Sequence, residues 1–154
     1  METQSETIRY TADVVVVTRD RPLRRLLNRI FRRTSGHVLL VERGWPPHAG
    51  KWALPGGHAN RGETSREAGA RELGEETGVH VKAKDLRQIG VFDHPDRDPR
   101  GRYVTVAYLA VVPANTPIVA MDDAADARWW PLNALPELAF DHADILAAAM
   151  DSTS

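Results

Sequence analysis

The stretch from Gly57 to Val79, GHANRGETSREAGARELGEETGV, decides how this sequence folds. It predicts a loop that leads into a helix. Thr64 and Glu67 have the T-x-x-E spacing of a capping box, in which each residue satisfies a backbone N–H that the start of a helix leaves without a partner. Gly78 is a typical residue just past a helix end. We therefore expect a helix that starts at Thr64 and runs to about Thr77.

The predicted helix is crowded with carboxylates. Five glutamates fall within fourteen residues, namely Glu63, Glu67, Glu72, Glu75 and Glu76. Because successive helix positions rotate by about 100°, Glu72 and Glu76 share a face and Glu75 lies beside them. Like charges at this spacing repel, and acidic residues near a helix C-terminus oppose the helix dipole. Glu67 has a partner in Arg71 four residues later, whereas the last three glutamates have none as good.

A bound cation would remove this penalty. Mg²⁺ takes oxygen ligands and often uses a few carboxylates together with substrate phosphates. The alternative is an acidic helix face that is simply solvated. Taken alone, the residues of the helix leave both interpretations open.

The whole stretch resembles the Nudix box, whose pattern is Gly-x5-Glu-x7-Arg-Glu-aliphatic-x-Glu-Glu-x-Gly-aliphatic. All nine defining positions match, from Gly57 through Glu63 and Arg71 to Val79. The preceding segment 50–57, GKWALPGG, is similar to the family's usual approach to the box. The resemblance extends over essentially the whole chain. It implies an α/β (α+β) fold, a Nudix-type α/β/α sandwich with a mixed central sheet.

The resemblance also implies an activity and a cofactor. Nudix enzymes are hydrolases that cleave a nucleoside diphosphate linked to another moiety, and they release a nucleoside monophosphate and a phosphorylated remainder. Mg²⁺ is the expected metal, and Mn²⁺ could replace it. Carried over by position, the metal-binding residues are Glu72 and Glu76 as principal ligands, Glu75 as an assisting one, the Gly57 carbonyl, and Glu63 in or near the outer shell.

The chemistry needs two further roles from the protein. By resemblance, Arg71 orients a carboxylate, a role that competes with its pairing to Glu67. Metal ions screen the diphosphate oxygens and lower the pKa of a bound water, and a carboxylate must then accept the proton of that water. The acceptor is either a glutamate of the box or an acid on a later loop. The loop candidates are Asp122, Asp123 and Asp126.

The segments after the box indicate the substrate. Residues 94–102, 122–131 and 138–142 resemble the ADP-ribose pyrophosphatase branch of the family, and Pro95 lies at an offset associated with ADP-ribose-type substrates. Guanidinium groups suit a second phosphate or a ribose. An aromatic side chain (Trp45, Phe92 or Tyr103) could stack an adenine or simply pack. The candidate substrate-binding residues are Arg43, Trp45, Arg97, Arg100 and Arg102.

Two other functions remain open. A (d)NTP pyrophosphohydrolase that removes damaged nucleotides uses the same box and differs only in its pocket. A non-catalytic ligand-sensing domain would keep the fold without turnover, although the complete set of carboxylates argues against it. A panel of nucleotide substrates separates these functions from hydrolysis of ADP-ribose.

The 154 residues suit one domain. We expect a flexible N-terminus at 1–8 and a single Nudix hydrolase domain at 9–154, with a basic insertion at about 19–35. Seven arginines fall within residues 19–33, among apolar residues at helical spacing. This pattern predicts a short amphipathic helix that packs on its own domain or, alternatively, meets an anionic membrane or partner.

Runs of β-branched and aromatic residues predict the strands. We expect them at 10–18, 37–43, 79–81, 86–92, 102–112 and 127–130, with a closing helix at 140–150. Side chains alternate across a strand. Of the adjacent Trp129 and Trp130, one should therefore face the core and the other should not.

Composition narrows the class of protein. A formal net charge of −1 disfavours a nucleic acid polymer as partner. The chain has no cysteine, which excludes disulfides and thiolate metal ligands. No apolar run approaches a membrane-spanning length, and the first nine residues lack the apolar core of a signal peptide. We expect a cytoplasmic protein that binds a small-molecule nucleotide, as a monomer or a homodimer.

Overall fold

A computed structural model describes residues 5–19 and 36–152 of the chain. Within these residues the chain forms seven strands, two α-helices and one 3-10 helix. In chain order they are β1 (Arg9–Arg19), β2 (His37–Arg43), β3 (Trp52–Ala53), β4 (Gly56–His58), α1 (Ser65–Thr77), η1 (Ala83–Asp85), β5 (Arg87–Phe92), β6 (Tyr103–Pro113), β7 (Ala124–Pro131) and α2 (His142–Asp151).

The strands form one mixed sheet around β1. Its main order is β3-β2-β1-β6-β5, while β4 pairs with β1 and β7 pairs with β2. β1 and β6 run parallel over their full length, and the other named pairs are antiparallel. The four valines from Val14 to Val17 lie on β1, and all are buried. The valine run therefore forms the buried central strand that it predicts.

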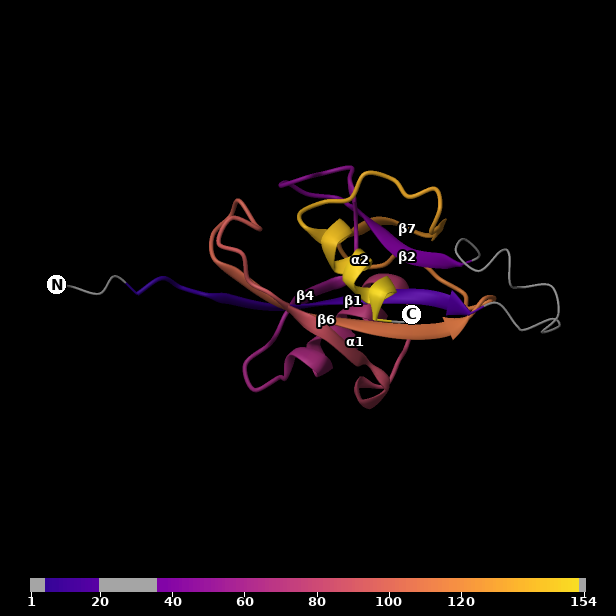
Figure 1. The fold of residues 1–154 in the computed structure, drawn as a ribbon, viewed down its shortest axis with the longest axis horizontal. Coiled ribbons are helices and arrows are strands. Elements are labelled where there is room, and N and C mark those ends of the chain that lie inside the picture. The colour runs from indigo at the N-terminus through magenta and orange to yellow at the C-terminus, as the bar shows by residue number, and fades with distance from the viewer. Residues whose placement is uncertain (1–4, 20–35, 153–154) are drawn as a thin grey trace.

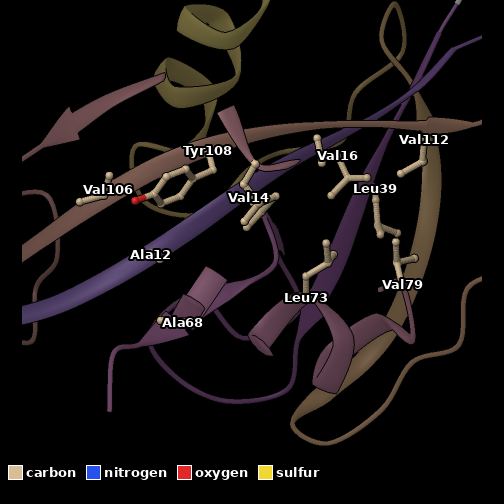
Figure 2. Packing of buried hydrophobic residues seen from close by; sticks show 12 residues of the cluster. Ala12, Val14, Val16, Leu39, Ala68, Leu73, Val79, Val106, Tyr108 and Val112 are labelled. Carbon is tan, nitrogen blue, oxygen red and sulfur yellow. The ribbon is translucent and has the colours of Figure 1, made fainter. Parts of the chain in front are cut away.

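The two helices cover opposite faces of the sheet (Figure 1). On one face, Leu73 and Ala68 of α1 pack with Val14 and Val16, and Figure 2 shows these side chains gathered between the helix and the sheet. On the other face, α2 packs against a second cluster that contains Val15 and Val17. The expected α/β/α sandwich with a mixed sheet is confirmed.

One expected strand is absent. Residues 79–81 form no strand, because the chain leaves α1 at Gly78 and reaches η1 five residues later without meeting a neighbouring strand. Val79 is buried with the α1 cluster instead. Burial of this short apolar run therefore comes from packing on the helix and not from sheet pairing.

The structure also differs from the sequence-based expectation at the short strands β3 and β4 and at β7, both of whose faces are covered. β3 and β4 have two and three residues, too few for an alternating pattern to show in the sequence. The expectation for Trp129 and Trp130 was wrong, because Trp129 packs on the α1 side and Trp130 on the α2 side. Since helices cover both faces of this sheet, alternation on β7 brings both indoles to a core.

Two predicted segments lie largely or partly outside the described residues. The predicted basic helix at 19–33 lies almost wholly outside the described residues, as do residues 1–4 of the predicted flexible N-terminus. Residues 5–8 form no regular structure. Among the described helices, none has the length and apolar character needed to cross a membrane.

The start of α1 is capped as the sequence predicts. The Thr64 hydroxyl accepts a hydrogen bond from the Glu67 N–H at 3.2 Å, and the Glu67 carboxylate accepts one from the Thr64 N–H at 2.9 Å. At the other end Gly78 has φ 70° and donates to the Gly74 carbonyl at 2.9 Å. Both helix ends are therefore fixed by local chemistry.

We expect Thr64→Ala to lower the free energy of unfolding by about 1 kcal/mol, because the helix start loses the side-chain acceptor of its cap. Thr64→Ser keeps that oxygen and serves as the matched control. Urea denaturation of the two variants measures the difference. Equal losses in both would show that the threonine methyl group, and not the cap, provides the stability.

Candidate active site

The glutamates of α1 meet the glycines of β4. The Gly56 N–H donates to Glu76 Oε2 at 3.0 Å. Gly57 lies so close to Glu72 that a Cβ on Gly57 would come within 2.6 Å of the carboxylate. Only glycine permits this approach. The fold thus brings together three of the residues that the resemblance assigns to the metal, two carboxylates and one backbone carbonyl.

Arg71 donates hydrogen bonds to three carboxylates. It donates to both oxygens of Glu63 at 2.8 and 3.0 Å, to Glu72 at 2.8 Å and to Glu75 at 2.9 Å. These bonds raise the pKa of Arg71, and they hold the pKa of Glu63 below its usual range. The alternative partner, Glu67, is not used, because it caps the helix. The contacts are those of an arginine that orients carboxylates.

The surroundings of Glu76 favour its protonated form. Burial raises the pKa of Glu76 to about 8. The hydrogen bond from Gly56 opposes this rise, while the carboxylates of Glu72 and Asp13 add to it. A carboxylate in this setting needs a positive charge to remain ionised at neutral pH. A divalent cation between Glu72 and Glu76 would provide it.

The donor set fits a hard cation. Carboxylate and carbonyl oxygens are the ligands that Mg²⁺ prefers. Among the described residues, no three His, Cys, Asp or Glu side chains already converge as a metal site. Glu72 and Glu76 line an open cavity together with Gly57, so oxygens of a substrate and of water could complete the coordination.

We expect the metal-free protein to lose stability as the pH rises towards 8. The pKa of Glu76 in the folded state lies above its unfolded value, so the folded state binds this proton more tightly. The stability that the bound proton contributes is fully present below pH 4.5 and is lost as the pH rises through about 8. The loss should amount to a few kcal/mol. Urea denaturation in EDTA at pH 6.5 and 8.5 measures it.

Glu76→Gln is the control for this pH effect, because glutamine cannot ionise and other titrating groups are common to both proteins. The difference between the two proteins should therefore widen from pH 6.5 to 8.5 in favour of the variant. A constant difference across this range would show that Glu76 has an ordinary pKa in the folded protein.

The cavity in front of these residues has a volume of about 440 Å³, which suits a small ligand. Its acidic side contains Glu72 and Glu76. Arginine and aromatic side chains from three other segments line it as well, namely Arg43, Trp45, Arg97, Arg100, Tyr103 and Phe140. A cavity with carboxylates and guanidinium groups can hold a cation and an anionic ligand together.

Arg43 and Arg100 have aromatic neighbours in this cavity. The guanidinium carbon of Arg43 lies 4.8 Å from the centre of the Phe140 ring, and that of Arg100 lies 4.8 Å from the Tyr103 ring. Burial, and then the positive charge of Arg100, lower the pKa of Arg43. Arg100 also makes a bidentate pair with Asp98, at 3.0 and 2.7 Å. Two held guanidinium groups of like charge favour an anion near them.

The other three candidate substrate residues differ in access. Trp45 is 67% exposed at the rim of the cavity. The Arg97 side chain is only 5% exposed, and it pairs with Asp141. Arg102 does not line the cavity and donates to the Asp93 carbonyl at 2.6 Å. The structure therefore places Arg43, Trp45 and Arg100 where a ligand can reach them, and it places Arg102 elsewhere.

The three loop acids are also separated. Asp123 lines the cavity, whereas Asp122 and Asp126 do not, and Asp126 pairs with Arg128 at 2.6 Å. The loop that carries Asp123 is tied to the end of α1, because the Met121 N–H donates to the Glu76 carbonyl at 2.9 Å. Among the three loop acids, only Asp123 lines the cavity that contains Glu72 and Glu76.

Sequence reasoning missed Asp13 and His142. Both are buried, both line the cavity, and the Leu54 N–H donates to His142 Nδ1 at 2.9 Å. Asp13 does carry a signal, because a carboxylate directly before four valines of a buried strand is rare unless it has a partner. His142 carries none, since its partner lies 88 residues away in the sequence.

Known proteins share sequence and fold with this chain. The sequence profile of the NUDIX domain matches residues 23–149. The ADP-ribose pyrophosphatase of Methanocaldococcus jannaschii is 45% identical over 109 residues, which make up 71% of this chain and 63% of that relative. The match thus spans a little under two thirds of the relative's own length.

Two solved structures share the fold. The NUDIX domain of Shewanella oneidensis NrtR, complexed with ADP ribose, has a TM-score of 0.77 at 27% identity, over 97% of this chain and 91% of that one. A bifunctional NMN adenylyltransferase/ADP ribose pyrophosphatase from Francisella tularensis, complexed with AMP and a Mn ion, has a TM-score of 0.77 at 29% identity, over 99% of this chain and 44% of that one. A domain profile that covers most of the sequence and a shared fold lead to one conclusion: the chain belongs to the Nudix family.

Proposed function

We propose that this protein is a Mg²⁺-dependent Nudix hydrolase that cleaves the diphosphate of ADP-ribose or a similar nucleotide sugar. The products would be a nucleoside monophosphate and a phosphorylated remainder. One observation carries the proposal: a single cavity contains the carboxylates Glu72 and Glu76 and the guanidinium groups of Arg43 and Arg100. A diphosphate has two negatively charged phosphates. A cation held by the carboxylates could bind one of them, and the guanidinium groups could bind the other.

In this reaction the protein would bind the metal, position the carboxylates and accept a proton. Glu72, Glu76 and the Gly57 carbonyl would hold the metal, which screens the phosphate oxygens and lowers the pKa of an attacking water. Arg71 keeps Glu72 and Glu75 in place through its hydrogen bonds. Either a box glutamate or Asp123 would accept the proton of the water.

The distal part of the substrate would lie against the other cavity residues. Arg43 and Arg100 would bind the phosphate or ribose that the metal does not hold. Trp45 is exposed at the rim and offers a flat apolar surface to a base. Hydrolysis of ADP-ribose is supported by the relative named ADP-ribose pyrophosphatase and by the neighbour complexed with ADP ribose.

A substrate panel tests this proposal. ADP-ribose, NADH, a diadenosine polyphosphate, the dNTPs and 8-oxo-dGTP would each be incubated with Mg²⁺, Mn²⁺ or EDTA, and products identified by chromatography. We expect ADP-ribose to show the highest kcat/KM, with AMP and ribose phosphate as products and no turnover in EDTA. A preference for 8-oxo-dGTP would identify a nucleotide-pool enzyme. Nucleotide binding without any turnover would identify a sensing domain.

A further inference from the structure

Arg97 belongs to an arginine-rich loop, and this position predicts a contact with substrate. In the structure, however, the Arg97 side chain is buried. Its side chain is 5% exposed. Its Nε and Nη2 donate to the two oxygens of Asp141 at 2.9 and 2.7 Å, which is the bidentate geometry that guanidinium and carboxylate prefer. The edge of the guanidinium group that would bind a phosphate is therefore both engaged by a carboxylate and buried, whereas Arg100, which pairs with Asp98 in the same way, has a side chain that is 41% exposed.

Arg97 also lies beside a second carboxylate, that of the buried Asp13. Its Nη2 is 3.9 Å from Asp13 Oδ2, the oxygen that accepts a hydrogen bond from the Thr105 hydroxyl at 2.7 Å. The other oxygen of Asp13 is 3.8 Å from His142 Nε2. Asp13, Arg97, Asp141 and His142 form what we call the Arg97 cluster, which joins β1, the loop between β5 and β6, and the start of α2.

The histidine of this cluster is neutral and oriented. Its Nδ1 accepts the Leu54 N–H at 2.9 Å, so Nε2 carries the proton and points towards Asp13. Burial lowers the pKa of His142, which keeps the ring uncharged. Arg97 is therefore the cation that stands between the two carboxylates of the cluster, Asp13 and Asp141.

The Arg97 cluster borders the segment that shapes the metal site. Leu54, held by His142, starts the segment Leu54–Gly57, and Asp13 pairs with Gly56 across the β1–β4 ladder. The contact is tight, since a Cβ on Gly56 would lie 2.6 Å from Asp13 Oδ1. The same Gly56 donates its N–H to Glu76, and Gly57 touches Glu72. A shift of Asp13 would therefore be felt at both metal-binding carboxylates.

We propose that Arg97 is a positioning residue which, through Asp13 and Asp141, fixes the segment Leu54–Gly57 and with it the metal site. Asp13 is buried and Asp141 is partly buried, and without a cation these two carboxylates would repel each other and draw in water. Removal of Arg97 would thus loosen β4 and displace Glu76 and the Gly57 carbonyl. The kinetic part of this proposal rests on the proposed function, but the effect on metal binding does not.

The test compares Arg97→Gln, Asp141→Asn and the double variant. Mn²⁺ affinity is measured by electron paramagnetic resonance without nucleotide, and kcat and KM are measured with ADP-ribose. We expect each single variant to weaken Mn²⁺ binding by about tenfold, as loss of an outer-shell partner does, and to lower kcat with KM little changed. The double variant should be no worse than the worse single one, because both break the same pair.

A substrate contact gives the opposite pattern. If Arg97 binds phosphate, Arg97→Gln raises KM at unchanged Mn²⁺ affinity and Asp141→Asn has a weaker, additive effect; either result overturns the proposal. Arg87→Gln is the matched control, since Arg87 is exposed and donates to Ser152 away from the cavity. If Arg97→Gln does not fold, Asp141→Asn decides alone, through its Mn²⁺ affinity and its KM.

The two proposals can fail separately. If wild-type protein turns over no substrate, the proposed function fails, while Mn²⁺ affinity of the variants still tests the Arg97 cluster. If ADP-ribose is hydrolysed and all variants bind Mn²⁺ like wild type, the positioning role of Arg97 fails alone.

Discussion

Glu76→Gln should leave a folded protein that has lost at least about 99% of its kcat. Loss of an outer-shell partner of a metal already costs 10- to 100-fold, and Glu76 is expected to be a direct ligand. Glutamine keeps the size of the side chain and an oxygen that can still accept the Gly56 N–H. It lacks only the negative charge, so the loss would report on the metal and not on packing.

Stability should change in the other direction. Burial raises the pKa of Glu76 to about 8, so ionisation of this group at high pH costs the metal-free fold stability. The glutamine variant avoids this cost. We expect it to be more stable than wild type in EDTA at pH 8.5 and to gain little stability from added Mg²⁺. A residue that merely supports the fold would lose activity and stability together.

Glu137→Gln is the matched control for this experiment. Glu137 forms an exposed ion pair with Lys51 at 2.7 Å and does not line the cavity. An exposed pair contributes little to stability, and this variant should keep wild-type kcat and metal affinity. Turnover by Glu76→Gln within about tenfold of wild type would remove Glu76 from the metal site.

The α1 helix and the shared face of its glutamates could be predicted because their information is local. The capping box Thr64/Glu67 and the stop at Gly78 depend on residues within one turn. The spacing of Glu72 and Glu76 also fixes their shared face whatever the rest of the chain does. The same local logic failed for Arg71, because three carboxylates compete for it and Glu67 is engaged by Thr64.

The cavity residues show where local information ends. The charge of Arg97, Arg100 and Arg102 does not distinguish one from another. No residue near Arg97 in the sequence indicates that it pairs with Asp141, 44 residues later. The role of Asp13 depends equally on strands and loops that meet only in the folded chain. Selecting Asp123 among the loop acids required the three-dimensional path of that loop.

Alanine at Gly56 and at Gly57 should separate folding from metal binding. At Gly56 the new Cβ would lie 2.2 Å from the Ala12 carbonyl oxygen and 2.8 Å from the Asp13 Cα, both backbone atoms of β1. β1 cannot retreat, because β6 pairs with it along its whole length on the other side. We expect Gly56→Ala to lower the free energy of unfolding by about 3 kcal/mol or more, as measured by urea denaturation.

At Gly57 the three atoms nearest to the new Cβ, at 2.6 to 2.9 Å, all belong to the carboxylate of Glu72, the far end of a flexible side chain. We expect Gly57→Ala to keep its stability within about 1 kcal/mol, because Glu72 can move aside. Its Mn²⁺ affinity and kcat should fall by about tenfold or more, because the same movement removes a metal ligand. Gly90→Ala is the control, since Gly90 lies on β5 with only an ordinary contact to Phe92 at 3.8 Å.

The pair is informative because the two glycines are adjacent and the substitution is the same. If stability alone set activity, Gly56→Ala would be the less active of the two in proportion to its unfolded fraction, and Gly57→Ala would be close to normal. If Gly57 gives Glu72 its place at the metal, Gly57→Ala is fully folded, binds Mn²⁺ weakly and turns over slowly. Normal Mn²⁺ affinity in that variant would mean that Glu72 binds no metal from the position next to Gly57.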